Sequence, residues 1–534
     1  MTGAPVADRD ALVDDADGSL RTSRAARPRG LGPLLVAVAV IALAARLVPV
    51  LTAGTLRGVL GYDDGVHLAL AQRLLAGLLP YRDEVFLHPP GIAVLLAPFA
   101  ATADLLGDSW ALALVRLAFM ALGATAAVLV ALVLAPRGAL AAAVGGGAYA
   151  LWGAAVAAEH TAYLQVPINV GLLVALLALR RAAPGTSAST PFVRRALAVS
   201  GVALGLAVTV KTWVVLDAAV LGLLVLSRWG VRAAGRWVAW CVAGAAPVVL
   251  PFLVAAPGAF WQDVVVTQLA RPRQDKGLAF RLGTLDPTAG LHAPPSETVA
   301  LGVGLVLLAL VLAPLAAATP RRVRPRRWAD PVWWGLLAAV QLLALALAPS
   351  YYLHYAAFVA PALCLLLGAG AGGLVRVVRA RGGRPARVGV AALTTLAVVG
   401  GAGLALTQPP LPIRSQVDNA ALAELVAGHE CLWARNPSFL QVADVAADQV
   451  DAGCPATPDV VGASLLLHAG GSLPRTSARD LDALVLEELA ASDGALLAAH
   501  RPKQDLGPRA RAYLEEHFTP AGRAGNIELW TRRP

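Results

Sequence analysis

Long apolar runs separated by short polar stretches fill the chain between residue 31 and about residue 410. A helix that crosses a bilayer needs roughly 20 mainly apolar residues. Runs that approach this length lie at 31–53, 110–135, 139–158, 161–179, 196–212, 213–228, 237–256, 298–318, 331–349, 355–375 and 388–408. The pattern predicts an α-helical polytopic membrane protein with about 11 transmembrane helices.

Two shorter apolar stretches follow the first run and do not fit this scheme. The stretch 66–79 has a polar and an apolar face, which predicts a helix lying along the membrane surface. The stretch 89–105 contains Pro98 and Asp104, which predicts a re-entrant or juxtamembrane helix. The first loop is therefore expected to carry juxtamembrane helices.

The two ends of the chain differ from this central part. Residues 1–30 are polar and are predicted to be a disordered cytoplasmic tail before an uncleaved first helix. From residue 411 the apolar runs shorten, with an amphipathic helix predicted at 481–497 and a short strand at 526–531. We therefore expect a membrane domain over 31–410 and a small soluble α/β domain over 411–534.

Composition and charge support this class of protein. Of the 534 residues, 57% are hydrophobic and 15% charged, which is typical of integral membrane proteins. The net charge is +10, but the arginines lie in short clusters between apolar runs and form no stripe of the kind that binds nucleic acid. With a cytoplasmic N-terminus, the positive-inside rule holds for the clusters at 136–138, 180–195, 228–236, 319–330 and 376–387. The same topology makes the C-terminal domain extracytoplasmic, in a multi-pass protein of the plasma membrane.

Histidines and carboxylates gather on the predicted outer face. The five histidines before the C-terminal domain all fall there: His67, His88, His160, His292 and His354. Most acidic residues between 60 and 300 do the same, and acidic residues contribute little to topology. This distribution indicates a site on the outer face. The alternative is that longer outer loops simply hold more polar residues.

Asp63 and Asp64 are the best candidates for chemistry in this region. A carboxylate beside another carboxylate has a raised pKa, which suits a general base. The alternative is a solvated loop with an Asp-Asp-Gly turn.

A series of short motifs runs through the first half of the chain. The Asp63-Asp64 pair is followed by the amphipathic stretch and then by His88-Pro89-Pro90-Gly91, and later by Arg116, Glu159 and the segment 205–211 ending in Lys211. In order and sidedness these motifs resemble the GT-C glycosyltransferases, the superfamily of polyprenyl-phosphate-sugar-dependent enzymes. Protein O-mannosyltransferases and the lipid A aminoarabinose transferase belong to it. Gly91 departs from the pattern, since the superfamily usually has Leu there.

The resemblance implies an inverting transferase. It would move mannose or another hexose or pentose from a polyprenyl-phosphate donor to a cell-envelope glycan, glycolipid or protein. Asp63 is the first choice for the base, Asp64 stays open, and Glu159 matches a second acidic position. The leaving phosphate needs cations, and the candidates for binding it are His88, Arg116, Lys211, Arg271 and Arg273.

Several of these residues have plainer interpretations. Arg116 could be buried with an acidic neighbour, and Arg271 and Arg273 could contact lipid headgroups or the C-terminal domain. The aromatic patch around Tyr352 could be an interfacial belt. It could also belong to a substrate groove, for which the candidates are His67, His160, Tyr352, His354 and Tyr355.

No cofactor is expected, although Asp63, Asp64, His67 and Glu159 could supply ligands to a divalent metal. Cys431 and Cys454 could form a disulfide if the C-terminal domain faces an oxidising compartment. That domain could also position the acceptor.

The competing functional class is a transporter or flippase for a lipid-linked or small polar substrate. A transporter usually has paired repeats and a polar site near the midplane of the membrane. In this sequence the polar residues gather at one surface, which favours the transferase. A scaffolding protein would leave the cluster around Asp63 without a purpose.

Overall fold

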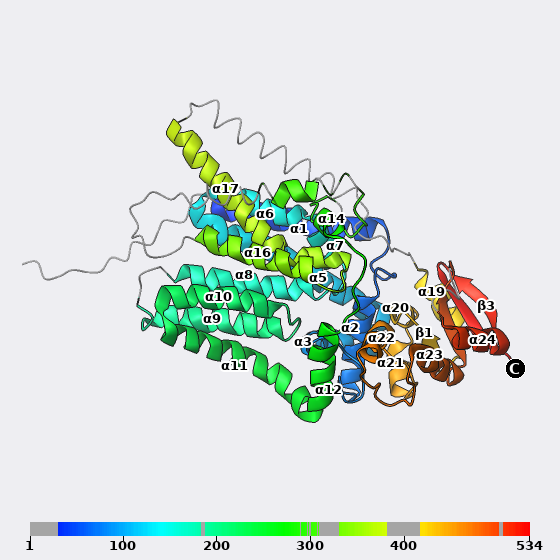
Figure 1. Ribbon diagram of the computed structural model, residues 1–534. Coiled ribbons are helices and arrows are strands. Elements are labelled where there is room, and N and C mark those ends of the chain that lie inside the picture. The colour runs from blue at the N-terminus through cyan, green and yellow to red at the C-terminus, as the bar shows by residue number, and fades with distance from the viewer. Residues whose placement is uncertain are drawn as a thin grey trace, which may run out of the picture.

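The computed structural model describes residues 30–182, 187–288, 330–381, 417–500 and 506–534, together with most positions of 290–308. Long helices lie side by side in a bundle, and the C-terminal elements cover one end of it (Figure 1). The predicted tail at 1–29, the run 388–408 and most of the run 298–318 fall outside the described residues.

Within the described part, five helices are long and apolar enough to cross a membrane. They are α1 (Leu31–Thr52), α5 (Asp108–Leu134, extended by the short helix η1 at Ala135–Arg137), α9 (Pro191–Val208), α11 (Val231–Ala255) and α16 (Asp330–Leu347). A sixth span results if α6 (Ala139–Leu151) and α7 (Gly153–Glu159), bent by 56° at their junction, are counted together. The predicted helical membrane architecture is thus found, while the number of about 11 spans stays a prediction.

Three more helices cover other predicted runs. They are α8 (Gln165–Arg181), α10 (Val214–Trp229) and α17 (Ala360–Arg381). In the bundle α9 packs between α8 and α11, and α6 packs between α5 and α17. Glycine permits the close approach of α9 to α11, because a Cβ on Gly205 would lie 2.1 Å from the carbonyl oxygen of Cys241.

The first loop forms α2 (Asp63–Leu75), α3 (Gly91–Ala100) and α4 (Ala103–Leu106). The helices α3 and α4 fit the predicted break in 89–105. The helix expected at 66–79 is α2, and nearly all of it is buried, its polar face included. It packs against α3 and α5 on one side and against C-terminal helices on the other.

The C-terminal part is a mixed α/β unit, as predicted. Its sheet has the order β1-β2-β4-β3, in which β1 and β2 are parallel and the other pairs antiparallel. The strands are β1 (Leu432–Ala434), β2 (Gly494–Ala498), β3 (Phe518–Ala524) and β4 (Ile527–Arg532). The helices are α19 (Asn419–Val426), α20 (Ser438–Val442), α21 (Ala446–Asp451), α22 (Val460–His468), α23 (Leu481–Ala490) and α24 (Pro508–His517).

One prediction in this part needs correction. The expected helix at 481–497 ends at Ala490, and its last residues belong to β2. The apolar residues of β2 are buried between β1 and β4, so pairing within the sheet overrides their helical periodicity. The strand expected at 526–531 is β4.

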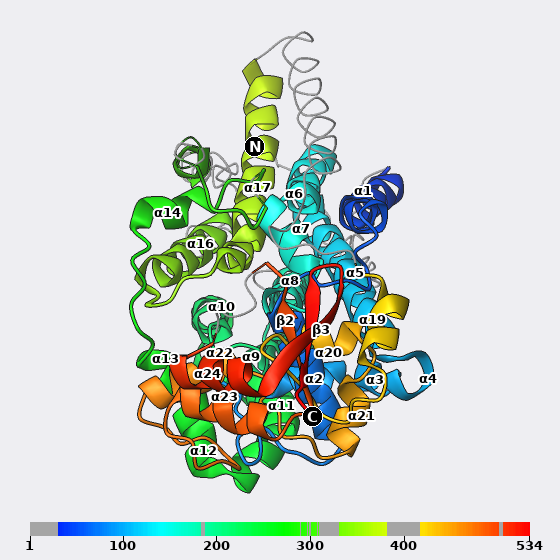
Figure 2. The same cartoon turned by 90° about the vertical axis from the view of Figure 1, so that its right-hand side faces the viewer.

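Direct hydrogen bonds dock the C-terminal unit on the first loop. Ser438 Oγ donates to the carbonyl oxygen of Gly61 (3.0 Å), and Gln441 Nε2 donates to that of Gly65 (2.8 Å). The carboxylate of Asp108 accepts from the backbone amides of Ala446 and Ala447. In Figure 2, where the C-terminal unit faces the viewer, this unit lies in front of the end of the bundle. The helix α2 is therefore enclosed between the two parts of the molecule.

Candidate active site

A cavity of about 440 Å³ lies where the bundle end meets the C-terminal unit. Its walls come from the start of α2, the stretch 86–88, the turn between α9 and α10, the segment 271–276, the short helix η3 (Leu353–Phe358) and the start of α22. The predicted site residues that line it are Asp63, His67, His88, Lys211, Arg271, Tyr352, His354 and Tyr355.

The two adjacent aspartates have different surroundings. Asp64 is fully buried, and its Oδ2 accepts from Arg116 Nη2 (2.7 Å) and Nε (3.0 Å). Arg116 Nη1 also donates to two backbone carbonyls, those of Leu56 and Gly58. The side chain of Asp63 instead faces the cavity and is 37% exposed. Asp64 and Arg116 thus neutralise each other away from the cavity, which leaves Asp63 as the carboxylate of the pair that a ligand can reach.

The electrostatic surroundings raise the pKa of Asp63 to about 7. Burial is the main cause, the negative charge of Asp459 is the next, and the positive charges of Lys211 and Arg271 act in the opposite direction. His354 Nε2 lies 3.9 Å from Asp63 Oδ2. Burial and nearby cations hold the pKa of His354 well below its usual value, so the ring is neutral at pH 7 and forms no ion pair with Asp63.

Three cationic side chains line the same cavity: Lys211, Arg271 and Lys276. Lys211 lies in the turn between α9 and α10, outside both helices, with its Nζ 4.5 Å from the ring centroid of Tyr355. Lys276 Nζ donates to the carbonyl oxygen of Tyr351 (2.8 Å). Burial, helped by the charge of Arg271, lowers the pKa of Lys211 to about 7. In the described part of the chain none of the three forms an ion pair with a carboxylate.

Aromatic rings and histidines complete the walls. The ring of His354 stacks on Tyr163, with centroids 4.2 Å apart, and lies nearly parallel to the ring of Tyr352. His67 contacts the carbonyl oxygen of Ala162 through Nδ1 (2.8 Å), and burial lowers its pKa to about 4. Neutral imidazoles and phenol rings thus cover the side of the cavity around Asp63.

Other predicted site residues lie elsewhere. Glu159 is buried in an ion pair with Arg46 of α1 and also accepts from the hydroxyl of Tyr149 (2.9 Å). His160 contacts the backbone carbonyl of Arg46 (2.8 Å). Arg273 is exposed and does not line the cavity. Glu159 and His160, like Asp64 and Arg116, therefore do not line the cavity, and the bonds of Glu159 link α7 to α1 and α6.

Two charged residues of the cavity were not among the predicted site residues. Lys276 belongs to the segment 271–276, whose three basic residues stand out in the sequence, and only the fold shows which of them face inward. Asp459 lies almost 400 positions after Asp63, in a domain where no motif marks it. A sequence signal exists for Lys276 and none for Asp459.

The possible metal ligands are not brought together. Asp64 and Glu159 are each engaged by an arginine, while Asp63 and His67 face the cavity. Among the described residues, no three His, Cys, Asp or Glu side chains form a group that could hold a metal ion.

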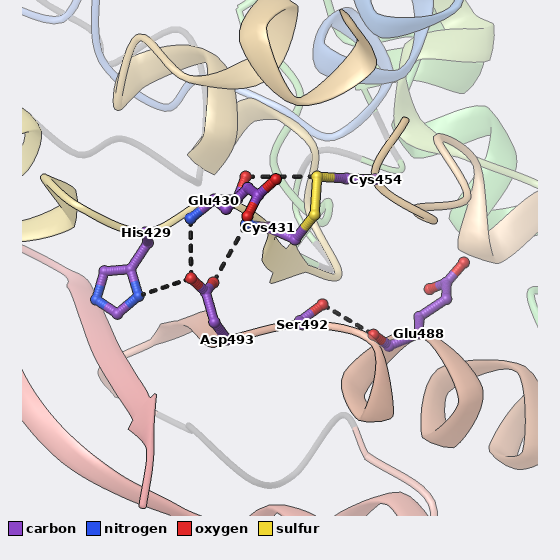
Figure 3. Close-up of a disulfide and its surroundings, with 7 residues drawn as sticks. All are labelled: His429, Glu430, Cys431, Cys454, Glu488, Ser492 and Asp493. Atoms are coloured by element: carbon purple, nitrogen blue, oxygen red, sulfur yellow. Dashed lines mark hydrogen bonds and ion pairs between the residues drawn. A yellow bond between two sulfur atoms is a disulfide. The ribbon is translucent and has the colours of Figure 1, made fainter. Parts of the chain in front are cut away.

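Cys431 and Cys454 form a disulfide, with their Cα atoms 5.6 Å apart (Figure 3). Asp493 holds the segment before β1 beside this bond by accepting from the backbone amides of Glu430 (2.8 Å) and Cys431 (3.2 Å). Cys454 is five positions before Asp459. The disulfide therefore ties the linker that leads into the cavity to the edge of the sheet.

No protein-family model and no curated protein matches the sequence. Solved structures do match its fold. ArnT from Cupriavidus metallidurans bound to undecaprenyl phosphate matches with a TM-score of 0.53 and 16% identity, over 94% of this chain and 98% of ArnT. The archaeal oligosaccharyltransferase AglB from Archaeoglobus fulgidus, in complex with an inhibitory peptide and a dolichol-phosphate, matches with a TM-score of 0.60 and 13% identity, over 95% of this chain and 74% of AglB. The chain therefore shares its fold with ArnT and AglB, and this is the fold that its motifs predicted.

Proposed function

We propose that this chain is an inverting glycosyltransferase that takes a sugar from a polyprenyl-phosphate donor. The observation that carries the proposal is a single cavity in which Asp63, free of an arginine partner, faces Lys211, Arg271 and Lys276. A base and a cationic phosphate site are the two parts that such a transfer needs. The similarity in fold to ArnT, which was solved with undecaprenyl phosphate, supports a lipid-phosphate donor.

Asp63 takes the proton of the acceptor hydroxyl as that oxygen attacks the anomeric carbon. The new glycosidic C–O bond forms on the face opposite the leaving group, and the bond to the phosphate oxygen breaks with its electron pair passing to the phosphate. Lys211, Arg271 and Lys276 stabilise the charge that develops there. Compared with the prediction from sequence, Lys276 takes the place of Arg116 and Arg273.

The topology belongs to the same proposal. A disulfide forms in an oxidising compartment, so the Cys431–Cys454 bond supports an extracytoplasmic C-terminal domain over 411–534. The cavity then opens on the outer face of the plasma membrane, the membrane domain spans 31–410, and the tail at 1–30 is cytoplasmic. The acceptor is a molecule of the cell envelope.

The test is turnover by the purified chain with a panel of polyprenyl-phosphate mannose, glucose and arabinose donors. Asp63→Asn should lower kcat by about 10²–10⁴-fold, because an amide cannot accept the proton. Asp104→Asn, an exposed carboxylate of the same loop, is the matched control and should retain activity.

If Asp63→Asn turns over the donor as fast as the wild type does, Asp63 is not the base. If the wild type turns over none of the donors, the transferase fails, and uptake of lipid-linked sugar into proteoliposomes then tests the transporter.

A further inference from the structure

The C-terminal domain contributes a carboxylate to the cavity. Asp459, at the start of α22, is half-buried and lines the cavity with Val461, Gly462 and Leu465 of the same helix. In the described part of the chain, Asp459 and Asp63 are the two carboxylates of this lining. One comes from the soluble domain and the other from the first loop of the membrane domain.

A direct link connects the two carboxylates. Asp459 Oδ1 accepts from the backbone amide of Gly462 (2.8 Å), as the N-cap of α22, and from the hydroxyl of Tyr62 (3.1 Å). The hydroxyl of Tyr62 in turn accepts from the amide of Val461 (3.1 Å). Since Tyr62 precedes Asp63, these bonds hold the start of α22 beside the start of α2. Both of these bonds reach Oδ1, and the residue lines the cavity.

Capping alone does not require a carboxylate at this place, because Asn caps helices as well as Asp does. Asp480, which caps α23 on the exposed surface of the same domain through a bond from the amide of Ala483 (2.8 Å), also pairs with Arg509. Burial and the second carboxylate beside it make the negative charge of Asp459 unfavourable, and Arg271 offsets this only in part, because the pKa of Asp459 stays raised.

The charge of Asp459 indicates which part of the reaction it serves. A donor phosphate is attracted to Lys211, Arg271 and Lys276, and a carboxylate repels it. Inversion places the attacking hydroxyl on the face of the sugar away from the phosphate, next to Asp63. A carboxylate only accepts hydrogen bonds, so the group that meets Asp459 there is a donor such as a second hydroxyl.

We propose that Asp459 binds a hydroxyl of a carbohydrate acceptor, beside the hydroxyl that Asp63 deprotonates, so that the C-terminal domain forms the acceptor half of the site. This inference rests on the proposed function. One sugar ring offers neighbouring hydroxyls to the two carboxylates, whereas a Ser or Thr side chain has a single hydroxyl. The stacked rings of Tyr163, His354 and Tyr352 give the cavity the aromatic surface that the apolar face of a sugar contacts.

The electrostatics support the same arrangement. The negative charge of Asp459 is the largest cause after burial that raises the pKa of Asp63. Removing this charge should therefore make Asp63 a weaker base and shift the acid limb of the pH–rate profile to lower pH. The acid limb reports the charge of Asp459, and the acceptor KM reports its contact with a hydroxyl.

The experiment uses the full chain, a donor that the wild type turns over, and octyl glycosides of mannose, glucose and galactose as acceptor probes. Asp459→Asn keeps the cap and an oxygen for Tyr62 but loses the charge. We expect the acceptor KM to rise about tenfold or more, the donor KM to change less than about twofold, and the acid limb to move to lower pH. Asp480→Asn is the matched control and should behave as the wild type. Asp459→Glu, which keeps the charge, should recover part of the acceptor affinity.

Equal changes in donor and acceptor KM, or an acceptor KM and acid limb like those of the wild type, would overturn the inference. So would a wild type that glycosylates Ser/Thr peptides and none of the octyl glycosides. A melting temperature near the wild-type value confirms that Asp459→Asn is folded. Absence of wild-type turnover with every donor instead removes the proposed function, and this inference with it.

Discussion

At the scale of residues, the two neighbouring aspartates Asp63 and Asp64 differ in their surroundings. Asp64 is balanced by Arg116 and holds α2 to α5, whereas Asp63 faces a cavity with cations at a distance. The sequence could not decide between them, because the partner of Asp64 lies 52 positions away. The sequence shows the Asp63-Asp64 pair and leaves two possibilities for Arg116, binding of phosphate or burial with an acidic neighbour. Only the packing shows that Arg116 is buried with Asp64.

This division predicts a difference in stability. Asp64→Asn should lower the free energy of unfolding by about 3–5 kcal/mol, because it leaves the Arg116 guanidinium buried without a counter-charge. Asp63→Asn should cause no such loss, since an ionised Asp63 with a raised pKa already costs stability at neutral pH. Thermal unfolding of both variants in detergent measures the difference. Equal melting temperatures would contradict the assignment.

The pH dependence of kcat/KM should be bell-shaped with a maximum near pH 7. Below about pH 7 the base Asp63 becomes protonated, and above about pH 7 Lys211 loses its charge in the empty cavity. In Lys211→Arg, which keeps its charge at all these pH values, the alkaline limb should move to higher pH while the acid limb stays. A profile that is flat between about pH 5 and pH 9 would argue against both residues.

At the scale of elements, long helices follow from apolar pattern alone, and short elements depend on their neighbours. The runs of α1, α5 and α11 were predictable, since a helix is the way to satisfy an apolar backbone in lipid. The burial of α2 was not, because its polar face is covered by residues that come almost 400 positions later. The strand β2 was predicted as the end of a helix, because its partners β1 and β4 come from other parts of the C-terminal domain.

The contact between α2 and α20 can be tested at Gly65. A Cβ there would lie 2.3 Å from Ser438 Oγ and 2.6 Å from the Ser438 backbone nitrogen, so Gly65→Ala must move α20 away. Because α2 carries Asp63, a shift of about 1 Å at its contact with α20 should lower kcat/KM by about 10²-fold. Gly235→Ala in α11, where a Cβ meets nothing within 4 Å, is the control. Unchanged activity in Gly65→Ala would show that this contact does not position the site.

At the scale of the whole molecule, the cavity proposed as the active site is lined by residues of both the helical bundle and the C-terminal unit. The patterns predicted the helical membrane domain, the mixed C-terminal domain and the wall around Asp63, His88 and Lys211. They could not predict the wall that contains Asp459, because nothing in the local sequence relates two segments that meet only after folding. Glu159, chosen by its place in a motif, pairs with Arg46 and does not line the cavity.

The disulfide should stabilise the C-terminal domain and the linker to Asp459. Replacing both Cys431 and Cys454 with Ser should lower its stability by roughly 3 kcal/mol, since the bond closes a loop with a sequence separation of 23. The acceptor KM should rise because the linker is released. Melting curves and kinetics with and without a reductant measure both effects. The reductant should lower the melting temperature and raise the acceptor KM of the wild type, and it should change neither quantity in the double variant.

The docking of α20 on the backbone carbonyls of Gly61 and Gly65 also bears on biosynthesis. In the proposed topology, the first loop is translocated before the C-terminal domain, so the cavity gains the wall that contains Asp459 only after that domain has also crossed the bilayer. We therefore expect transferase activity to appear only after that step.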